Sequence, residues 1–466
     1  MGVNHRLRRC GLRTTRLGLV VALLLAAGLG LAPSAAAVSV SEEIALGRRF
    51  ELEARSRLPL VFDVDALSYL TRIGQRLVGA LGSQPFDYRF YVTRDARVNA
   101  FAVPGGVIYV NAGLLLRAES DDELAGVLGH EIAHIHAHHL ARQQEATRAF
   151  GYAALLGMLL SAVRPELAVG SAALQAATQL QYQREFEQEA DYQGARIMRE
   201  AGYDPRGLLA FFKKLMEEQR ANAAAATPYL LSHPLTETRL TNLEAVLKQL
   251  PGGTASSSAV PPRRLGRIQV RLRTLLEPAA TVVAFYRARA DAAPNEAENF
   301  ACLGLAYLYA GQADLAGAAF ERAQQLGAAD LAREIGRTKL AERQFGEAVR
   351  WLRQAVADDP ADAVARFELG RALLALGDEP GARDAFRQAV ELVPNFDDAH
   401  YQLGTLAGRG GDEATGLYHL GKSFYLRGEF DKAAAYWDRA LPGLAPGSAQ
   451  AREVGEILEE LRQTKR

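Results

Sequence analysis

The sequence predicts a mainly α-helical protein in which a domain with a small β-sheet is followed by an α-solenoid of helical repeats. Three observations predict this class. A run rich in Gly, Ser and Pro interrupts the chain at residues 251–262, a 34-residue repeat of small residues follows it, and two short segments with alternating apolar residues precede it. A chain of 466 residues is long enough for two or three domains.

The first 37 residues have the pattern of a secretory signal peptide. A basic segment without acidic residues ends at Arg16, an apolar run occupies residues 17–32, and small residues continue to Ala37, after which we expect cleavage. An uncleaved anchor helix is the alternative. Residues 38–466 contain 49 basic and 54 acidic residues, a net charge of −5, and no later run of the roughly 20 apolar residues that a bilayer crossing needs. We therefore expect export to the periplasm, no transmembrane segment in the mature chain and no nucleic-acid partner.

The interruption at residues 251–262 is interpreted as a linker, which divides the mature chain into a domain at 38–250 and a second domain at 263–466. In the first domain, the apolar periodicity predicts helices near residues 42–54 and 64–81 and strands at residues 88–93 and 107–111. Pro104, Gly105 and Gly106 have turn chemistry and lie between the two predicted strands.

The second domain repeats a pattern of small and bulky residues. Glycine is followed by alanine 12 residues later, a bulky apolar residue at 16 and alanine at 19, starting from Gly304, Gly336, Gly370 and Gly421. Gly336 and Gly370 are 34 residues apart, as are Gly370 and Gly404, a spacing typical of the tetratricopeptide repeat (TPR). Only 17 residues separate Gly404 from Gly421, so we expect one helical hairpin to be shortened or displaced there.

A metal-binding pattern lies on the helix that is predicted to begin after Ser120, where Ser120 and Glu123 have capping-box spacing. His130 and His134 are four residues apart, so their imidazoles lie on one helix face and can bind one zinc ion. Glu131 lies beside this pair and can act as the base for an attacking water. Solvated histidines on a helix face are the alternative interpretation.

Three more histidines follow the motif: His136, His138 and His139. His134 and His138 also form an i, i+4 pair, but Ile135 follows His134 and cannot act as a base. We therefore interpret the three additional histidines as a polar helix end rather than as ligands.

The third ligand is sought on a downstream helix, because zinc hydrolases use three protein ligands and leave one position open. Glu187 and Asp191 are four residues apart and share a face. We expect Glu187 to bind zinc, and Asp191 to hold a ligand imidazole or to assist proton transfer. Glu185 and Glu189 lie on other faces and are interpreted as solvated charges.

The pattern His130-Glu131-x-x-His134 with Glu187-x-x-Ala190-Asp191 resembles the gluzincin family that contains HtpX and the CAAX prenyl proteases. Residues 99–106 and 110–115 also match that family just upstream of the metal-binding helix. The resemblance implies a zincin-like (gluzincin) metallopeptidase domain with one zinc ion per chain. Those proteases are embedded in membranes. A signal peptide, such a peptidase domain and a TPR domain together resemble the beta-barrel assembly-enhancing proteases of the Gram-negative periplasm.

This resemblance implies a zinc-dependent endopeptidase with a chaperone-like role, which assists outer-membrane barrel assembly and degrades misassembled barrel proteins. The expected partners are such unfolded or misassembled proteins and, through the TPR domain, the barrel-assembly machinery. It also implies that substrate lies as an extended strand along a sheet edge near residues 107–111. A TPR chaperone or adaptor with a latent or vestigial peptidase domain is the alternative function.

The last candidates lie in the segment from Ser232 to Arg239, where the family has a His-Pro pair followed by an arginine. The resemblance implies that this segment is near the metal. We expect His233 to act as a fourth ligand that keeps the enzyme latent. We expect Arg239 to support the transition state or an acid of the site. A histidine that caps a helix or bonds within a loop is the alternative for His233.

Overall fold

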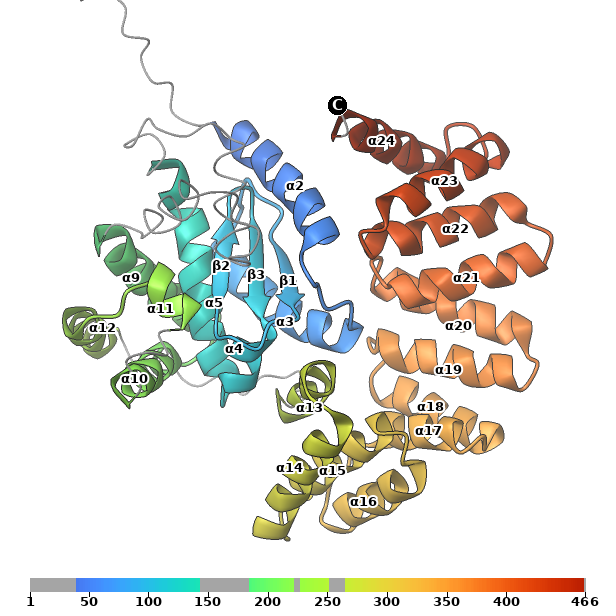
Figure 1. The fold of residues 1–466 in the computed structure, drawn as a ribbon, viewed down its shortest axis with the longest axis horizontal. Helices are drawn as coiled ribbons and strands as arrows, with labels where there is room; N and C mark the ends of the chain where they lie inside the picture. Colours follow the sequence, from blue (N-terminus) through green and yellow to red (C-terminus); the bar gives the residue numbers. More distant parts are fainter. Residues whose placement is uncertain (1–38, 143–183, 222–226, 251–264, 465–466) are drawn as a thin grey trace, which may run out of the picture.

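The computed structural model describes residues 39–142, 184–221, 227–250 and 265–464, which fold into an N-terminal domain and a curved stack of helices beside it (Figure 1). The mainly α class with a small sheet and helical repeats is confirmed. The predicted signal peptide at 1–37 and the linker at 251–262 lie outside the described residues. Within the described ranges, no helix combines the length and the apolar character that crossing a membrane requires.

The described part of the N-terminal domain contains one three-stranded sheet, surrounded by helices (Figure 1). Its elements are α2 (Val40–Arg57), α3 (Val64–Gly79), β1 (Arg89–Thr93), β2 (Ala100–Val103), β3 (Val107–Asn111), α4 (Ala112–Arg117), α5 (Asp121–His136), α9 (Arg184–Glu200), α10 (Arg206–Ala221), α11 (Pro228–Ser232) and α12 (Glu237–Gln249).

The strand order is β1-β3-β2, with β1 parallel and β2 antiparallel to β3. The alternation of apolar and polar residues did not predict β2, because all four of its residues are buried. Gly105 and Gly106 form the β2–β3 turn at φ +79° and +93°, a region that favours glycine. The expectation of a free sheet edge at residues 107–111 is wrong, because β3 is the central strand and both of its edges are paired.

Helix α5 begins as predicted, but its cap is only half of a capping box. The Ser120 hydroxyl accepts the Glu123 amide at 3.1 Å, whereas the Glu123 carboxylate accepts the amide of Glu119 at 2.8 Å. The same carboxylate pairs with Lys214 of α10 at 2.8 Å. Glu123 therefore ties the start of α5 to a neighbouring helix, and it completes no reciprocal cap.

Helix α5 runs through the core, where every residue from Glu123 to Ile135 is buried. Glycines let its neighbours approach closely: a Cβ added to Gly126 would lie 2.7 Å from the backbone of Leu208 in α10, and one added to Gly194 of α9 would lie 3.0 Å from the amide nitrogen of His130. The backbones of α5 and α9 are therefore in close contact. Side chains that project from both helices beside this contact lie close together.

The second domain is built from helical hairpins, as the repeat predicts. Its helices are α13 (Leu265–Leu276), α14 (Ala279–Ala292), α15 (Ala297–Tyr309), α16 (Ala313–Gln325), α17 (Ala332–Ala341), α18 (Phe345–Asp358), α19 (Ala363–Ala375), α20 (Glu379–Leu392), α21 (Asp397–Arg409), α22 (Glu413–Leu426), α23 (Phe430–Ala440) and α24 (Ala449–Thr464), with a short 3-10 turn η2 (Leu441–Gly443). In five of these hairpins, the bulky residue 16 positions after the repeat glycine packs against that glycine, as Phe386 does on Gly370.

The 17-residue spacing between Gly404 and Gly421 has a different cause from the one expected. No helix is shortened there: α21, α22 and α23 have 13, 14 and 11 residues. Instead, α22 belongs to two hairpins, because its Leu420 packs on Gly404 while its Gly421 receives Trp437 from α23. One helix thus serves as the second member of one hairpin and the first member of the next.

The two domains share α13. Leu265, Ile268 and Leu272 belong to the core of the N-terminal domain, whereas Val270 belongs to the core of the first repeats. The Gln269 amide also donates to two backbone carbonyls at the end of α4, at 3.0 and 2.8 Å. Helix α13 therefore joins the two domains through side chains in both cores.

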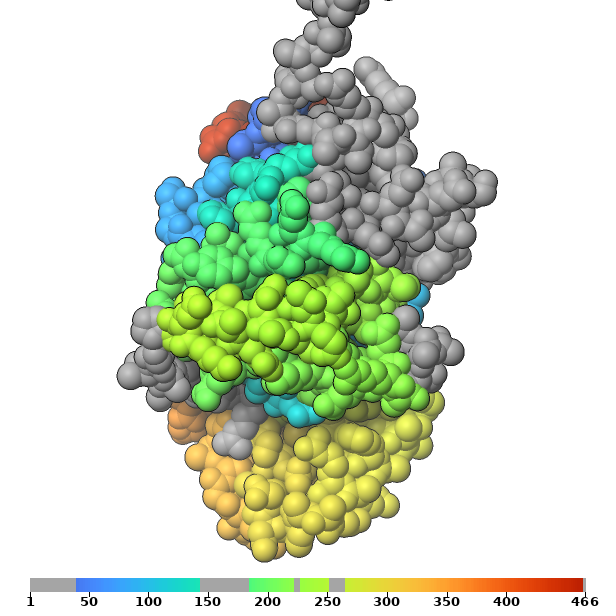
Figure 2. Space-filling model, turned by 90° about the vertical axis from the view of Figure 1, so that its left-hand side faces the viewer, coloured from blue at the N-terminus to red at the C-terminus, as the bar shows by residue number. Residues whose placement is uncertain are grey.

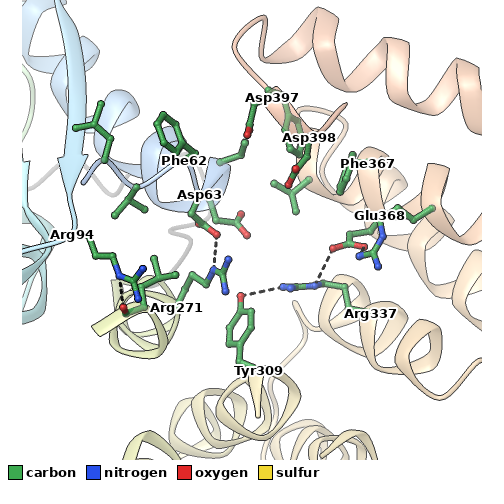
Figure 3. A pocket seen from close by; sticks show the side chains of 18 residues that line it. Phe62, Asp63, Arg94, Arg271, Tyr309, Arg337, Phe367, Glu368, Asp397 and Asp398 are labelled. Atoms are coloured by element: carbon green, nitrogen blue, oxygen red, sulfur yellow. Dashed lines mark hydrogen bonds and ion pairs between the residues drawn. The ribbon is translucent and has the colours of Figure 1, made fainter. Parts of the chain in front are cut away.

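Further contacts hold the repeats against the N-terminal domain. Asp63 pairs with Arg271, and Asp65 with Arg333, each at 2.7 Å. Farther along the stack, Gly428 lies so close to the carbonyl of Arg55 that an added Cβ would be 2.2 Å away. Between these contacts lies a cavity of about 420 Å³ that both domains line (Figure 3).

We expect Gly370→Ala to lower the free energy of unfolding by about 1–3 kcal/mol, because the new methyl group would meet Phe386 at 2.6 Å. The control is Gly346→Ala, since Gly346 lies in helix α18 with open space around it and should tolerate alanine. Thermal unfolding of the full chain, followed by circular dichroism, measures both. Equal stability of the two variants would contradict the glycine–bulky packing.

Candidate metal centre

Four buried side chains from three elements converge between α5 and the helices α9 to α12. Helices α9 to α12, green to yellow-green in Figure 2, form one side of the N-terminal domain. Helix α5 supplies His130 and His134, and α9 supplies Glu187. His233 follows α11 as its C-terminal cap residue. One nitrogen or oxygen from each of the four lies within 4.8 Å of the others.

Five of the six separations between these donors are close to the edges of a tetrahedral metal site. His130 Nε2 lies 3.0 Å from His134 Nε2, 3.5 Å from Glu187 Oε2 and 3.3 Å from His233 Nδ1. Glu187 Oε1 lies 3.4 Å from His134 Nε2 and 3.1 Å from His233 Nδ1. A tetrahedron with metal–ligand distances of about 2.0–2.1 Å has edges of about 3.3 Å. The donor set of three imidazoles and one carboxylate therefore fits zinc.

Glu131 lies beside these four donors and is fully buried. Neither of its carboxylate oxygens has a well-formed hydrogen bond within the described residues, and its nearest basic atom is His233 Nε2 at 3.5 Å. Burial raises the pKa of this carboxyl above its ordinary value. A buried carboxyl group without good partners is costly to keep, which is typical of a residue retained for chemistry.

Asp191 lies one turn after Glu187 and points at the first histidine. Its Oδ1 is 3.0 Å from His130 Nδ1, the ring nitrogen that faces away from the other donors. Burial by itself would raise the pKa of Asp191, but the hydrogen bonds from His130 and Arg239 hold it below its ordinary value. Of the two roles expected for Asp191, this geometry matches the holding of a ligand imidazole.

Arg239, in the first turn of α12, bonds to both acids of α9. Its Nε and one terminal nitrogen donate to the two oxygens of Asp191 at 2.8 and 2.7 Å, and the other terminal nitrogen lies 2.8 Å from Glu187 Oε2. The guanidinium also donates to the carbonyl of Pro234 at 2.9 Å. Arg239 thus contacts both acids of α9, and its expected role in supporting an acid of the site stays a prediction.

The interpretation of the three additional histidines as a polar helix end is wrong for His139. Helix α5 ends at His136, His138 takes a positive φ of 53°, and this reversal carries the chain back toward the site. His139 is fully buried, with Nδ1 2.8 Å from His134 Nδ1 and Nε2 3.1 Å from Glu189 Oε2. His136 and His138 lie nearer the surface, on Gln84 and Glu43.

Glu189 is partly exposed, as the prediction of a solvated charge requires, but it has partners that its position on α9 did not predict. It pairs with both His139 and Arg142, at 3.1 and 3.0 Å, whereas Glu185 on the same helix is exposed. Helical periodicity could not reveal this pair, because periodicity compares residues within one helix and His139 follows the end of α5.

Comparison with known proteins identifies both domains. Residues 67–247 match peptidase family M48, and residues 333–395 and 394–449 match the tetratricopeptide repeat. The beta-barrel assembly-enhancing protease of Yersinia pestis is 32% identical over 48% of this chain and 47% of its own length. The protein of the same name in Escherichia coli is 30% identical over 47% of each chain.

A mitochondrial metalloendopeptidase of Schizosaccharomyces pombe is 29% identical over 39% of this chain and 53% of its own length. The chain spans about half the length of the bacterial relatives it matches. The four donors and Glu131 all lie within residues 67–247, the part of the chain that matches the peptidase family. The chain therefore contains a peptidase family M48 domain, which is followed by tetratricopeptide repeats.

Proposed function

We propose that this protein is a zinc-dependent endopeptidase of the periplasm that assists the assembly of outer-membrane barrel proteins and degrades misassembled ones. The observation that carries the proposal is the convergence of three imidazoles and one carboxylate beside the buried, poorly partnered Glu131. Export rests on the signal-peptide pattern of residues 1–37. The barrel-related role rests on the names of the bacterial relatives.

His130, His134 and Glu187 would hold one zinc ion per chain. When bound, zinc supplies Lewis-acid chemistry, which activates water and polarises a peptide carbonyl. Glu131 is the general base: it takes the proton of the attacking water and passes it to the leaving amine. Asp191 and Arg239 touch no substrate in this scheme. Asp191 orients His130, and Arg239 neutralises the two buried acids of α9.

His233 is the latch of this proposal. Its Nδ1 lies at hydrogen-bond distance from His130 and Glu187, so it occupies the fourth donor position that a catalytic site leaves open for water and substrate. Its Nε2 also faces Glu131 at 3.5 Å. In this state the base and the open position are both covered, so the enzyme is latent until His233 moves away.

We assign the substrate-binding edge to β2 instead of β3. Within the described residues, β2 pairs with β3 and with no second strand, and the backbone of Ala102 is near enough to the Glu131 carboxyl to lower its pKa. An extended peptide that pairs with β2 would therefore place its backbone beside the base. Such pairing recognises backbone rather than side chains, which suits unfolded barrel strands with unpaired amides and carbonyls.

We propose that the TPR domain binds partners in the barrel-assembly machinery, because stacked helical hairpins present extended binding surfaces. The alternative function, a TPR chaperone with a vestigial peptidase domain, requires a defective metal site. The complete donor set and the retained Glu131 favour an active enzyme.

We expect Glu131→Gln to keep one zinc ion per chain but to lower kcat/KM about 10²–10⁴-fold, because it removes the base and no ligand. Cleavage of an unfolded outer-membrane barrel protein measures activity, and elemental analysis measures zinc. His130→Ala is the control that should lose the metal. In cells, the Glu131→Gln protein should retain uncut barrel precursors. Full proteolysis by this variant would refute the assigned mechanism, and zinc-free wild-type protein would refute the metal centre.

We expect His233→Ala to raise peptidase activity while zinc stays near one per chain, because it opens the fourth position and removes none of the three proposed ligands. His136→Ala is the matched control, since His136 is exposed and bonds only to Gln84 among the contacts described for it. The measurement is the cleavage rate per bound zinc ion. Unchanged or lower activity with zinc retained would assign His233 to structure or catalysis and not to a latch.

We expect Arg239→Met to cost the metal-free protein about 3–5 kcal/mol of stability, because it leaves two buried carboxylates without their cation. Arg196→Met, which removes an exposed pair with Glu200 on α9, should cost less than about 1 kcal/mol. Arg239 lowers the pKa of Asp191, so this stabilisation is present at neutral pH and is lost as pH falls through the lowered pKa. Thermal unfolding between neutral and acidic pH measures the difference. Similar losses in both variants would contradict this role.

A further inference from the structure

We propose that His139 is a positioning residue that fixes the tautomer of His134, so that the lone pair of His134 Nε2 points into the metal centre. This inference rests on the proposed function, because it assumes that a metal binds there. The inference gives a role to two residues that the proposed mechanism does not use: the buried His139 and its acidic partner Glu189.

His139 is held on three sides. Its Nδ1 lies 2.8 Å from His134 Nδ1, and its Nε2 lies 3.1 Å from Glu189 Oε2. Its ring stacks on Phe186, with ring centres 4.6 Å apart and planes 11° from parallel. Arg142 fixes Glu189 at 3.0 Å and also lies over the Phe186 ring at 4.6 Å. These contacts leave the imidazole of His139 with one orientation.

The order of these contacts determines where the protons lie. An ionised Glu189 can only accept a hydrogen bond, so His139 Nε2 must carry the proton between them. In a neutral imidazole the other nitrogen then has a lone pair, so His139 Nδ1 accepts. The proton in the 2.8 Å contact therefore belongs to His134 Nδ1, and His134 Nε2 is left with a lone pair that faces the other donors.

The opposite tautomers would place like groups against each other. A proton on His139 Nδ1 would turn the lone pair of Nε2 toward the Glu189 carboxylate, and His134 would then keep its proton on Nε2. That proton would point at His130 Nε2, 3.0 Å away, and would occupy the place of the metal. The chain of Glu189, His139 and His134 thus acts on one ligand as Asp191 acts on His130.

The test compares two substitutions of His139 in the full-length protein and measures zinc affinity by competition with a chelator. His139→Phe keeps the stacked ring but removes the acceptor, and we expect about 10–100-fold weaker zinc binding. His139→Asn places an amide oxygen near the position of Nδ1, so it should accept from His134 and lose less than about tenfold. The spectrum of the cobalt-substituted protein should change in His139→Phe and be largely restored in His139→Asn.

A second pair of variants keeps the proposal testable if His139→Phe does not fold. Glu189→Leu removes the acceptor of His139 from a partly exposed position and should also weaken zinc binding, whereas Glu185→Leu, at an exposed position on the same helix, should not. Unfolding temperatures with and without zinc separate the two effects: the metal-free value should stay near wild type, and the increase on adding zinc should shrink.

Wild-type zinc affinity in His139→Phe, or in Glu189→Leu where the former does not fold, would overturn the inference and leave His139 as a packing residue. A result in which His139→Asn is as weak as His139→Phe would also overturn it, because the acceptor would then be irrelevant. Neither outcome affects the proposed function, which fails instead if the wild-type protein itself binds no zinc.

Discussion

The close approach of α5 and α9 is the constraint on which the site depends. Gly194 lies against the backbone of His130, where an added Cβ would be 3.0 Å from its amide nitrogen. Because the two helices are so close, short side chains from both can reach the same point. The imidazoles of α5 therefore meet the carboxylate of Glu187, and no long, flexible side chain is needed. A larger residue at position 194 would push the helices apart and separate donors whose neighbouring atoms are now 3.0–3.5 Å apart.

Burial makes the partners of this site as important as its donors. Glu187 and Asp191 are almost fully buried, and two such acids on one helix face would repel each other in a medium of low dielectric. Arg239 lies between the two acids and bonds to both. The imidazoles of the site provide the other polar contacts of these carboxylates. The cation and the acids come from helices that are distant in sequence, so this balance exists only in the folded domain.

The sequence was most informative where the signal lies within one helix. The spacing of His130 and His134, and of Glu187 and Asp191, places each pair on one face whatever surrounds it. The interpretation of His139 as part of a polar helix end is wrong because the chain reverses at His138, and a positive φ at a non-glycine residue leaves no periodic pattern in the sequence. Strand β2 was missed for a related reason: a strand buried on both faces has no alternation of polarity. Tertiary contacts fix both features.

The segment that carries His233 is short and tied at both ends, which limits how a latch can move. The amide of Tyr229 donates to the carbonyl of Val98 at 3.2 Å at the start of α11, and Arg239 binds the Pro234 carbonyl and Asp191 at the start of α12. If these anchors persist, His233 can leave the donors only by a rotation confined to a few residues beside Pro234. Such a motion leaves His130, His134, Glu187 and their supporting residues in place, so opening the site would not require that the metal centre be rebuilt.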